Sequence, residues 1–296
     1  MSAGQRQVAC MTSMFSAPSS FAFQPEENIE RGFVRVLGQL ALQARRLTQH
    51  AHGKISESVH DTRVLIKWLR ALLWFAGPAF SSSEMNRAKS HLRRASHLLA
   101  GERELVVMRS ILARLAQKSD NSAYRRALAR IANAEDSQQT STENPHQSLR
   151  QAMAILLATI RQFERRAKIK SKWPSCSDRL ARAFLAAQKA GKEALNSDDA
   201  AQFHDWRKKT KRLLFQLQLT HAVPGRHMAR TIKRVDKLQE KLGDYHDCVI
   251  AQDRLQKSLP VKVPPRVVRR TVDLLEMRKH QLRKEVRQIA KHIRLQ

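Results

Sequence analysis

The sequence has few of the residues that would indicate a disulfide-rich, strand-rich or membrane-spanning protein. Its three cysteines, Cys10, Cys176 and Cys248, lie far apart and match neither a disulfide framework nor a metal motif, so we expect a reduced, cytoplasmic compartment. No apolar run is long enough to span a bilayer. Glycine and proline number only 9 each and gather between segments, which leaves long stretches free of helix breakers.

Acidic and aromatic residues are also scarce. The chain has 26 Asp and Glu against 55 Lys and Arg, which gives a net charge of +29 over 296 residues. Such an excess repels itself and attracts polyanions such as nucleic acid, anionic membrane or polymeric phosphate. Aromatic residues make up only 5%, which leaves few platforms on which the bases of a single strand could stack. The composition therefore predicts a polyanionic partner.

The residues that are abundant are good helix formers: Ala, Leu, Arg, Lys and Gln. No convincing alternation of apolar and polar residues predicts a strand. We therefore expect an all-α protein. The expected helices cover about 27–51, 58–76, 83–99, 102–118, 121–135, 145–170, 177–195, 199–221, 226–242, 244–258 and 265–294.

The segments between these helices suggest how the chain is divided. Residues 1–25 lack the continuous apolar core of a secretory signal, so we expect a loose N-terminal tail. The polar stretch 136–147 predicts a surface loop, and Trp173-Pro174 marks a break. We expect a first helical half over 26–172 and a second over 173–296, each a bundle of at least four helices.

Two pairs of segments repeat at nearly the same distance along the chain. Residues 59–75 and 203–219 superpose with a shift of 144 positions, and residues 98–107 and 241–250 with a shift of 143. The first shift pairs residues of one type: His60 with His204, Asp61 with Asp205, Arg63 with Arg207, Lys67 with Lys211 and Leu69 with Leu213. The repeats predict an internal duplication, with two pseudo-symmetric bundles that bring the two basic helices toward a shared face.

Each repeated helix carries its cations on one stripe. At helical spacing the stripes contain His60, Arg63, Lys67 and Arg70 in the first copy, and His204, Arg207 and Lys211, flanked by Lys208 and Arg212, in the second. Clustered cations repel one another unless an anion lies between them. A charged stripe on a single helix is usually an ordinary exposed face, but its recurrence in a second copy favours an anion-binding site.

Neighbouring residues are expected to support these stripes. The following helix of each half supplies further cations: Lys89 and Arg93 in the first half, and Arg230, Lys233, Lys237 and Lys241 in the second. We expect Asp61 and Asp205 to cap or neutralise rather than to bind a ligand. The pairs Arg103-Glu104 and His246-Asp247 follow helix breaks and are expected to brace turns. Whether His60 and His204 contact the ligand is left open.

An enzyme or a metalloprotein is a further alternative, because the chain has 12 histidines. However, it has no H-E-x-x-H motif, no Cys/His ligand quartet and no P-loop. No acidic pair that could hold a metal ion supports phosphoryl transfer through the repeated histidines. We therefore expect no catalytic residues, no metal site and no cofactor.

The repeated segments resemble the signature helices of the CHAD family, the histidine-containing α-helical domains. The resemblance rests on H-x-x-R-x-x-x-K-x-L-R at 60–70 and H-x-x-R-x-x-x-K-R-L at 204–213, followed by LLAGERELVV at 98–107 and LQEKLGDYHD at 238–247. The four landmarks come in the family's order and the likeness covers roughly 27–295. Ala100, Glu104, Val106 and His246 depart from the family's corner motifs. No triphosphate-tunnel domain is recognisable, which implies a stand-alone member.

The resemblance implies two four-helix bundles with a basic central groove or pore that binds inorganic polyphosphate, and an association with polyphosphate granules. The ligand-facing residues that it implies are His60, Arg63, Lys67, Arg70, His204, Arg207, Lys211 and Arg212. We therefore expect non-catalytic polyphosphate binding. The alternative is a non-specific nucleic-acid-binding protein, although no zinc-finger spacing or RNA-recognition motif is present.

Overall fold

The computed structural model describes residues 21–25, 27–50, 55–139, 144–167, 173, 175–197, 199–221, 225–257 and 263–293, with side chains except at 50, 56, 101–106 and 134–139. These residues form α-helices and no strand, which confirms the all-α prediction. The α-helices are α2 (Ile29–His50), α3 (Ile55–Ala76), α4 (Ser82–Leu98), α5 (Gly101–Gln117), α6 (Ser122–Gln139), α7 (Pro145–Ala167), α8 (Cys176–Leu195), α9 (Ala200–Thr220), α10 (Arg226–Lys257) and α11 (Pro265–Lys291).

Several helices begin at a side-chain cap. The Ser81 hydroxyl accepts a hydrogen bond from the Glu84 amide, and the Glu84 carboxylate accepts one from the Ser81 amide, which forms a capping box at α4. Ser175 caps α8 and Asp199 caps α9. Each side chain accepts one hydrogen bond from an amide of the first turn. These polar residues explain why the sequence locates most helix starts to within a few residues.

Two of the expected helix ends are wrong. The expected break at Gly243 is absent, since α10 runs without interruption through all 32 residues from Arg226 to Lys257. A glycine inside a helix costs only about 1 kcal/mol relative to alanine. Leu238, Leu242 and Tyr245 are buried on both sides of it, and their packing outweighs that cost. The polar loop expected to begin at 136 is still helical to Gln139, and residues 140–143 lie outside the described part of the chain.

The first bundle consists of α2, α3, α4 and α7, which pack against one another around an apolar core. Phe33, Leu37 and Leu72 are fully buried in it, and Phe80 and Phe163 meet edge to face at 4.9 Å between ring centroids. Large aromatic side chains dominate the burial of such cores. One side of α3 packs in this core, so the opposite side of α3 faces solvent.

The end of the expected N-terminal tail is part of this core. Phe21 and Phe23 are buried, with ring centroids 5.5 Å from Trp68 and 5.2 Å from Phe75. The Phe23 amide also donates a hydrogen bond to the Leu219 carbonyl at 2.7 Å. The expectation of a loose tail through residue 25 is therefore wrong for residues 21–23, and residues 1–20 lie outside the described structure.

Substitution of Gly32 tests this packing. A Cβ atom at Gly32 would lie 2.6 Å from Phe23 Cδ1 and 2.9 Å from Glu27 Oε2. Neither neighbour moves easily, because Phe23 is buried and Arg35 holds Glu27 at 2.7 Å. Overpacking costs about 1–3 kcal/mol, against about 1 kcal/mol gained in helix propensity. Gly32→Ala is therefore expected to lower the free energy of unfolding by up to about 2 kcal/mol, measured by urea denaturation.

Gly38 on the same helix supplies the matched control. It is exposed, and nothing lies within 4 Å of a Cβ atom added there. Gly38→Ala is expected to raise the free energy of unfolding by up to about 1 kcal/mol. Equal effects of the two substitutions would contradict the close packing of residues 21–25 against α2.

The second bundle consists of α8, α9, α10 and α11, and it also receives α5 and α6. Leu112 of α5 and Leu128 of α6 share one apolar core with Leu275 of α11. The Tyr124 and Thr271 hydroxyl oxygens lie 2.9 Å apart within this core. The expected division at residues 172 and 173 therefore follows the chain but not the packing, because α5 and α6 precede it and pack with the second bundle.

The two bundles meet where α3 crosses α9. Trp68 packs edge-on against Phe215 at 4.7 Å between centroids, and the Gln216 amide donates a hydrogen bond to the Ala71 carbonyl at 2.9 Å. The internal duplication itself stays a prediction.

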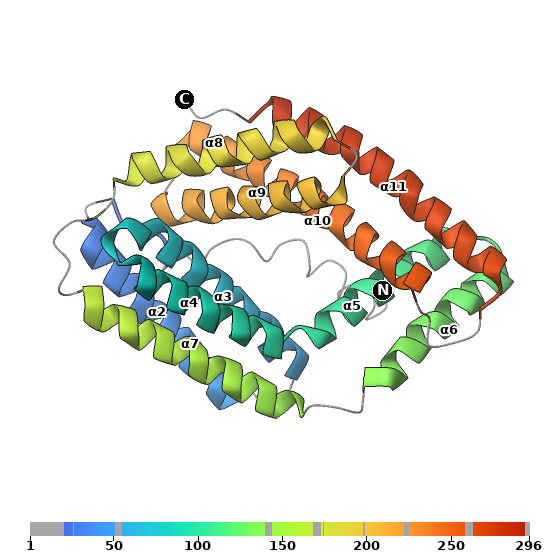
Figure 1. The fold of residues 1–296 in the computed structure, drawn as a ribbon, viewed down its shortest axis with the longest axis horizontal. Helices are drawn as coiled ribbons and strands as arrows, with labels where there is room; N and C mark the ends of the chain where they lie inside the picture. Colours follow the sequence, from blue (N-terminus) through green and yellow to red (C-terminus); the bar gives the residue numbers. More distant parts are fainter. Residues whose placement is uncertain are drawn as a thin grey trace.

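From this crossing the two bundles diverge (Figure 1). The C-terminal parts of α3 and α9 approach each other, their N-terminal parts spread apart, and α5 packs on α10 at the far side. The first arm consists of residues 57–70 of α3 and residues 89–99, which cover the C-terminal part of α4 and its cap. We name the second arm residues 200–211 of α9 with residues 239–250 of α10. The repeated basic stripes lie on these two arms.

Candidate anion-binding site

The first arm displays the stripe that the sequence predicts on α3. Leu65, Ile66 and Leu69 are buried against the first bundle, which turns the opposite face of the helix outward. On that outer face His60 and Arg70 are exposed. Arg63 and Lys67 lie between them and are half-buried. The four predicted cationic residues of this helix therefore occur together on one side.

The two arginines of this stripe also tie α3 to α4. Arg63 Nη1 donates a hydrogen bond to the Leu99 carbonyl, at the C-terminal end of α4. Arg70 Nη2 donates one to the Leu92 carbonyl at 2.6 Å. The Leu99 carbonyl is at the helix end, where carbonyls carry partial negative charge that favours a cation, whereas Leu92 lies within the helix. A guanidinium has five N–H donors, so each arginine can orient itself on α4 through part of its hydrogen-bonding capacity.

The α4 helix adds cations beside this stripe, as the sequence predicts. Lys89 and Arg93 are exposed and lie one turn apart. Lys89 Nζ donates a hydrogen bond to Asn86 Oδ1 at 3.4 Å. Desolvation, and then the nearby charge of Arg93, lower the pKa of Arg70. The two guanidinium groups are thus close enough to repel, and an anion between them would relieve that repulsion.

The second arm displays the corresponding stripe on α9. His204, Arg207 and Lys211 are half-buried and Lys208 is exposed, while Trp206 and Leu213 are buried on the opposite face. An added Cβ atom at Gly243 of α10 would lie 3.8 Å from Arg207 Nε, so the guanidinium of Arg207 extends across α10 at its glycine. Gly243 therefore lies beside Arg207 within a continuous helix.

The acid of the second motif has an internal partner. Asp205 forms an ion pair with Lys209, one turn along α9, at 2.8 Å. This contact supports the prediction that the aspartate neutralises a cation of the protein. Its counterpart Asp61 is exposed, and partial desolvation raises its pKa. The two repeated aspartates therefore have different surroundings although they occupy equivalent sequence positions.

His246 of α10 is a site residue that the sequence analysis missed. Its ring lies against His204, with centroids 4.5 Å apart and planes inclined at 34°. The sequence reading assigned His246 to a turn, but α10 is continuous there and directs the ring toward α9. Neighbouring helices of one bundle run side by side, so a histidine on α10 can meet a histidine on α9. The presence of His246 on the helix that follows α9 was therefore the sequence signal that could have identified it.

Burial governs the electrostatics of His204. Its Nδ1 atom is buried without a hydrogen-bond partner among the described residues. Burial lowers the pKa of His204, as do the charges of Lys208 and Arg207, while Asp205 opposes them. The imidazole is therefore held neutral beside cations. A neutral imidazole can donate one hydrogen bond to an anion, and a protonated imidazole can donate two.

The lowered pKa of His204 predicts that acid destabilises the ligand-free protein. In the unfolded chain the imidazole takes up a proton near pH 6.5, whereas the folded protein resists protonation to a lower pH. The resulting stability is present above pH 6.5 and is lost as the pH falls toward the folded-state value. His204→Gln should flatten this part of the stability curve in urea denaturation between pH 7.5 and 5.5. An unchanged curve would contradict the assignment.

A bound anion should reverse the direction of this effect. An anion near the imidazole favours its charged form and so raises the pKa of His204. Binding would then be linked to proton uptake, and affinity for an anion should rise as the pH falls from 7.5 to 5.5. His204→Gln should remove part of this rise, measured by titration at both pH values, while His227→Gln on the exposed start of α10 is the control.

Three of the predicted residues lie away from the two arms. Arg212 is exposed, and its guanidinium lies 5.0 Å from the centre of the Trp74 ring, near the crossing of the bundles. Partial desolvation at this contact lowers the pKa of Arg212, and the charge of Asp205 opposes that shift. Lys233 and Lys237 are exposed on α10. At 3.6 residues per turn they lie roughly a quarter to half a turn around the helix from Gly243 and His246, which face α9.

The other residues that the sequence analysis considered are distributed as follows. Arg230 is exposed near the start of α10. Lys241 forms an ion pair with Glu285 of α11 at 3.0 Å, and so holds α10 to α11. The side chains of Arg103 and Glu104 lie outside the described residues. An acidic partner 44 positions away in the sequence could not have been assigned to Lys241 from spacing alone.

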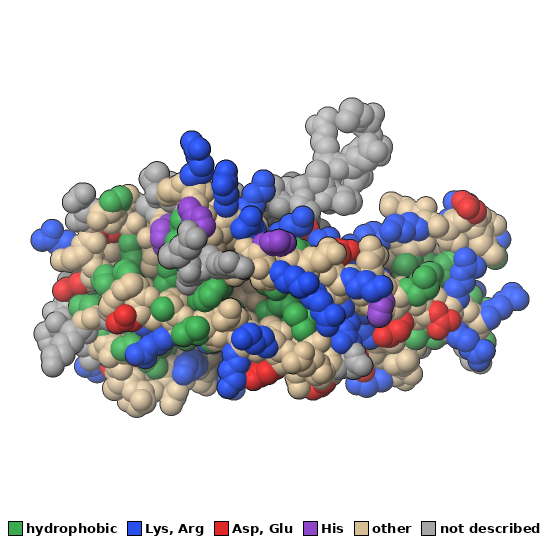
Figure 2. Space-filling view, turned by 90° about the horizontal axis from the view of Figure 1, so that it is seen from above, with side chains coloured by type: hydrophobic (Ala, Val, Ile, Leu, Met, Phe, Trp, Pro, Cys, Tyr) green, Lys and Arg blue, Asp and Glu red, His purple; other side chains and the backbone are tan. Residues whose placement is uncertain are grey.

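Cation-rich surface extends well beyond the arms. Figure 2 shows Lys and Arg side chains along the whole length of one face, with histidines among them.

Within the described residues no group of three His, Cys, Asp or Glu side chains could hold a metal ion. In the same part of the chain no helix has the length and apolarity needed to cross a membrane. Burial, chiefly, raises the pKa of Cys248 to about 11, which keeps its thiol protonated.

Comparison with known proteins agrees with the all-α fold and identifies the family. The family model for the CHAD domain matches residues 38–256. The crystal structure of the CHAD domain from the plant Ricinus communis shares the fold with a TM-score of 0.56 and 18% sequence identity, over 93% of this chain and 96% of that chain. No curated protein matches. Because the family match covers well over half of the sequence, the chain belongs to the CHAD family.

Proposed function

We propose that the protein binds inorganic polyphosphate, without turning it over, across the basic stripes of its two arms. The observation that carries this proposal is the repetition of imidazole, guanidinium and ammonium groups in the same order on α3 and α9. Each helix holds its apolar side in a bundle core and its cations outward. Membership of the CHAD family, which is linked to polyphosphate, supports the choice of this polyanion.

The chemistry of the stripes suits a chain of phosphates. Arginine forms bidentate bonds with phosphate oxygens, and lysine acts as a compact positive charge. His204 and His246 add imidazole donors at the second arm. Binding releases the counterions that surround the polymer, which supplies much of the favourable free energy. That treatment was developed for nucleic acids and applies here by analogy, since both polymers carry regularly spaced phosphates.

We further propose that the protein acts in the cytoplasm at polyphosphate granules, and that it has no enzymatic role. The motif content supports the second point, since the sequence lacks a P-loop and a set of carboxylates that could hold Mg²⁺. Incubation of long-chain polyphosphate with the protein should leave the polymer length unchanged on a gel. Shortening that His204→Gln abolishes would overturn the non-catalytic assignment.

Competition with DNA tests the preference for polyphosphate. Aromatic residues are too few to provide many base-stacking platforms, and half-buried cations suit a thin, base-free polymer. Labelled long-chain polyphosphate should therefore stay bound when duplex DNA is added at the same total phosphate concentration near physiological salt. Equal displacement by DNA would identify the protein as a general binder of polyanions, and would favour the nucleic-acid alternative.

A further inference from the structure

A pocket in the second bundle lies against a different face of α9 from the basic stripe. It has a volume of about 680 Å³ and is bounded by α8, α9, α10 and α11. Trp206, Thr210 and Leu213 line it from α9, and helical spacing places Trp206 and Leu213 more than a third of a turn, and Thr210 about a quarter of a turn, around the helix from the stripe of His204, Arg207 and Lys211. This pocket therefore uses a different face of the helix from the proposed polyphosphate site, and its volume suits a small molecule.

The walls of the pocket are apolar. Phe184 and Ala187 contribute from α8, while Val235 and Leu238 contribute from α10. Gly191 allows the close approach of α8 to Trp206, because an added Cβ atom would lie only 2.9 Å from the indole ring. An apolar wall of this kind binds the hydrocarbon part of a ligand by removing it from water.

The rim of the pocket is positively charged. Lys192 of α8 and Arg287 and Lys291 of α11 line it and are exposed, and none of the described lining residues is acidic. Arg287 Nη2 donates a hydrogen bond to the Leu195 carbonyl at 3.2 Å, which positions its guanidinium between α11 and the end of α8. Three cations at the edge of an apolar pocket favour a ligand with an anionic head.

The pocket also contains a buried polar group that the protein leaves unsatisfied. Thr210 is 1% exposed, and its hydroxyl has no hydrogen-bond partner among the described residues. A buried hydroxyl without a partner is costly. Because Thr210 lines the pocket, an acceptor oxygen on a ligand could satisfy it.

We propose that this pocket binds a small amphiphilic anion in which a carbonyl group joins an apolar chain to a phosphate or carboxylate head. The chain contacts the apolar walls, the carbonyl oxygen accepts a hydrogen bond from Thr210, and the head binds at Lys192, Arg287 and Lys291. The pocket and its three kinds of lining group carry this inference independently of the proposed polyphosphate site.

Four probes separate these features in isothermal titration of the full chain below their micelle concentrations. Decanoylglycerol phosphate and N-decanoylglycine combine a chain, a carbonyl and an anionic head, and at least one should bind with one molecule per chain. The stronger of the two identifies the head as phosphate or carboxylate. Monodecanoylglycerol, which lacks the anion, and glycerol phosphate, which lacks the chain, should each bind at least about 10-fold more weakly. Equal binding of either, or no binding of the first two, would overturn the proposal.

Thr210→Val gives a test that does not depend on charge. The variant should be at least as stable as the wild type without ligand, because it removes an unpaired hydroxyl. It should bind the better carbonyl-containing probe about 2- to 10-fold more weakly, and decyl phosphate, which has no carbonyl, with unchanged affinity. Equal affinity of wild type and variant for the carbonyl-containing probe would contradict the role of Thr210.

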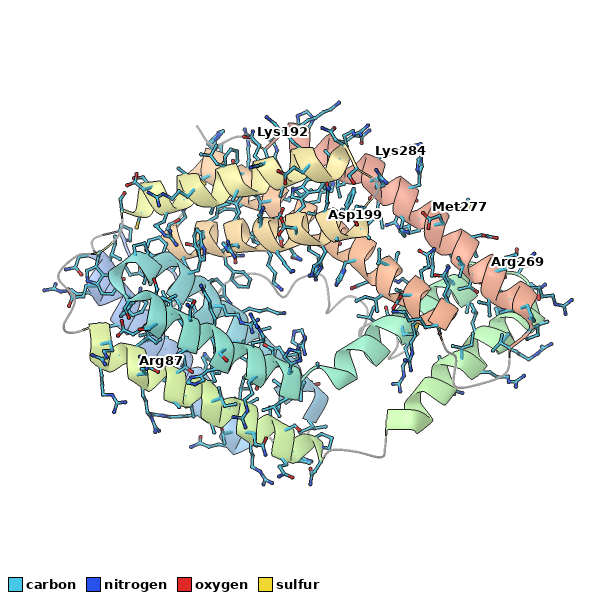
Figure 3. The ribbon with its side chains drawn as sticks, in the orientation of Figure 1. Arg87, Lys192, Asp199, Arg269, Met277 and Lys284 are labelled. Atoms are coloured by element: carbon cyan, nitrogen blue, oxygen red, sulfur yellow. The ribbon has the colours of Figure 1, made fainter. Side chains whose placement is uncertain are left out.

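The rim is tested by Lys192→Glu/Lys291→Glu against a matched control with the same change in net charge. The control is Arg269→Glu/Lys284→Glu, both exposed on α11 and outside the pocket lining; Figure 3 labels these two residues and Lys192. The rim variant should lose about 10-fold or more in affinity for the acylated anion, and the control should change little. Equal loss in both variants would show diffuse charge attraction and overturn the assigned site.

Discussion

Charge reversal at both Arg63 and Arg207 is expected to lower the affinity for long-chain polyphosphate by about 100-fold or more. These residues occupy equivalent positions on the two repeated helices, one on each arm. A hydrogen bond to a charged group contributes about 1.5–3 kcal/mol, so the loss of two corresponds to roughly 10²- to 10⁴-fold in affinity. The two introduced carboxylates add repulsion. The measurement is equilibrium binding of labelled polyphosphate near physiological salt.

Controls must separate loss of binding from loss of folding, since Arg63 also bonds to the Leu99 carbonyl. Circular dichroism and urea denaturation of the double variant establish whether the helices remain. Lys67→Gln/Lys211→Gln removes two further repeated cations without touching that contact, and should weaken binding in the same direction. Arg269→Glu/Lys284→Glu applies the same change in net charge on α11. If this control lost as much affinity as Arg63→Glu/Arg207→Glu, the assignment to the arms would be wrong.

An increase in salt from 50 to 200 mM is expected to lower polyphosphate affinity by roughly 10³-fold or more. Such a dependence corresponds to six or more phosphates contacted by cations, in the treatment developed for nucleic acids. The arms supply a comparable number of cations: Arg63, Lys67, Arg70, Lys89 and Arg93 on one, and Arg207, Lys208 and Lys211 on the other. The measurement is the slope of log affinity against log salt.

The slope also reports how many contacts each substitution removes. Lys67→Gln/Lys211→Gln should reduce its magnitude by about two, because each lysine that contacts a phosphate contributes roughly one unit. The Arg269→Glu/Lys284→Glu control should leave the slope nearly unchanged. A shallow slope in the wild type, with affinity insensitive to salt, would exclude a mechanism dominated by phosphate neutralisation.

The sequence predicted the helices well because local signals determine them. Apolar spacing and the scarcity of helix breakers defined the expected ranges of α3 and α9, and the structure shows local caps at Ser81, Ser175 and Asp199, close to where α4, α8 and α9 were expected to begin. It failed at Gly243, where the expected break depended on a single residue of low helix propensity. The packing of Leu242 and Tyr245 decides the conformation there, and that packing is a tertiary effect.

The arrangement of the helices was harder to predict than the helices themselves. Chain order placed α5 and α6 with the first bundle, whereas Leu112 and Leu128 pack with Leu275 of α11. Nothing local distinguishes an apolar stripe that packs on the preceding helices from one that packs more than 140 positions later. Phe21 and Phe23 were assigned to the tail for the same reason, since their partners Trp68 and Phe75 lie about 50 positions away.

The stripes of the candidate site were predictable because each lies on one helix, where the period of 3.6 residues fixes which side chains share a face. The contacts between helices were not. His246 lies against His204, and Arg63 and Arg70 bond to carbonyls of α4, yet no spacing rule connects these residues. Conversely, Lys237 has helical spacing from Lys233 and Lys241 but lies away from the face of α10 that meets α9.

The most direct test of the proposal that one polymer spans both arms is a titration of long-chain polyphosphate with wild type, Lys67→Gln and Lys211→Gln. When the protein is in excess, we expect polyphosphate to bind at a single class of site. Each single substitution should lower the affinity of that site, because both arms hold the same polymer and each contributes to its avidity. The contrary result is two independent sites in the wild type, with each substitution removing one and leaving the other at full affinity.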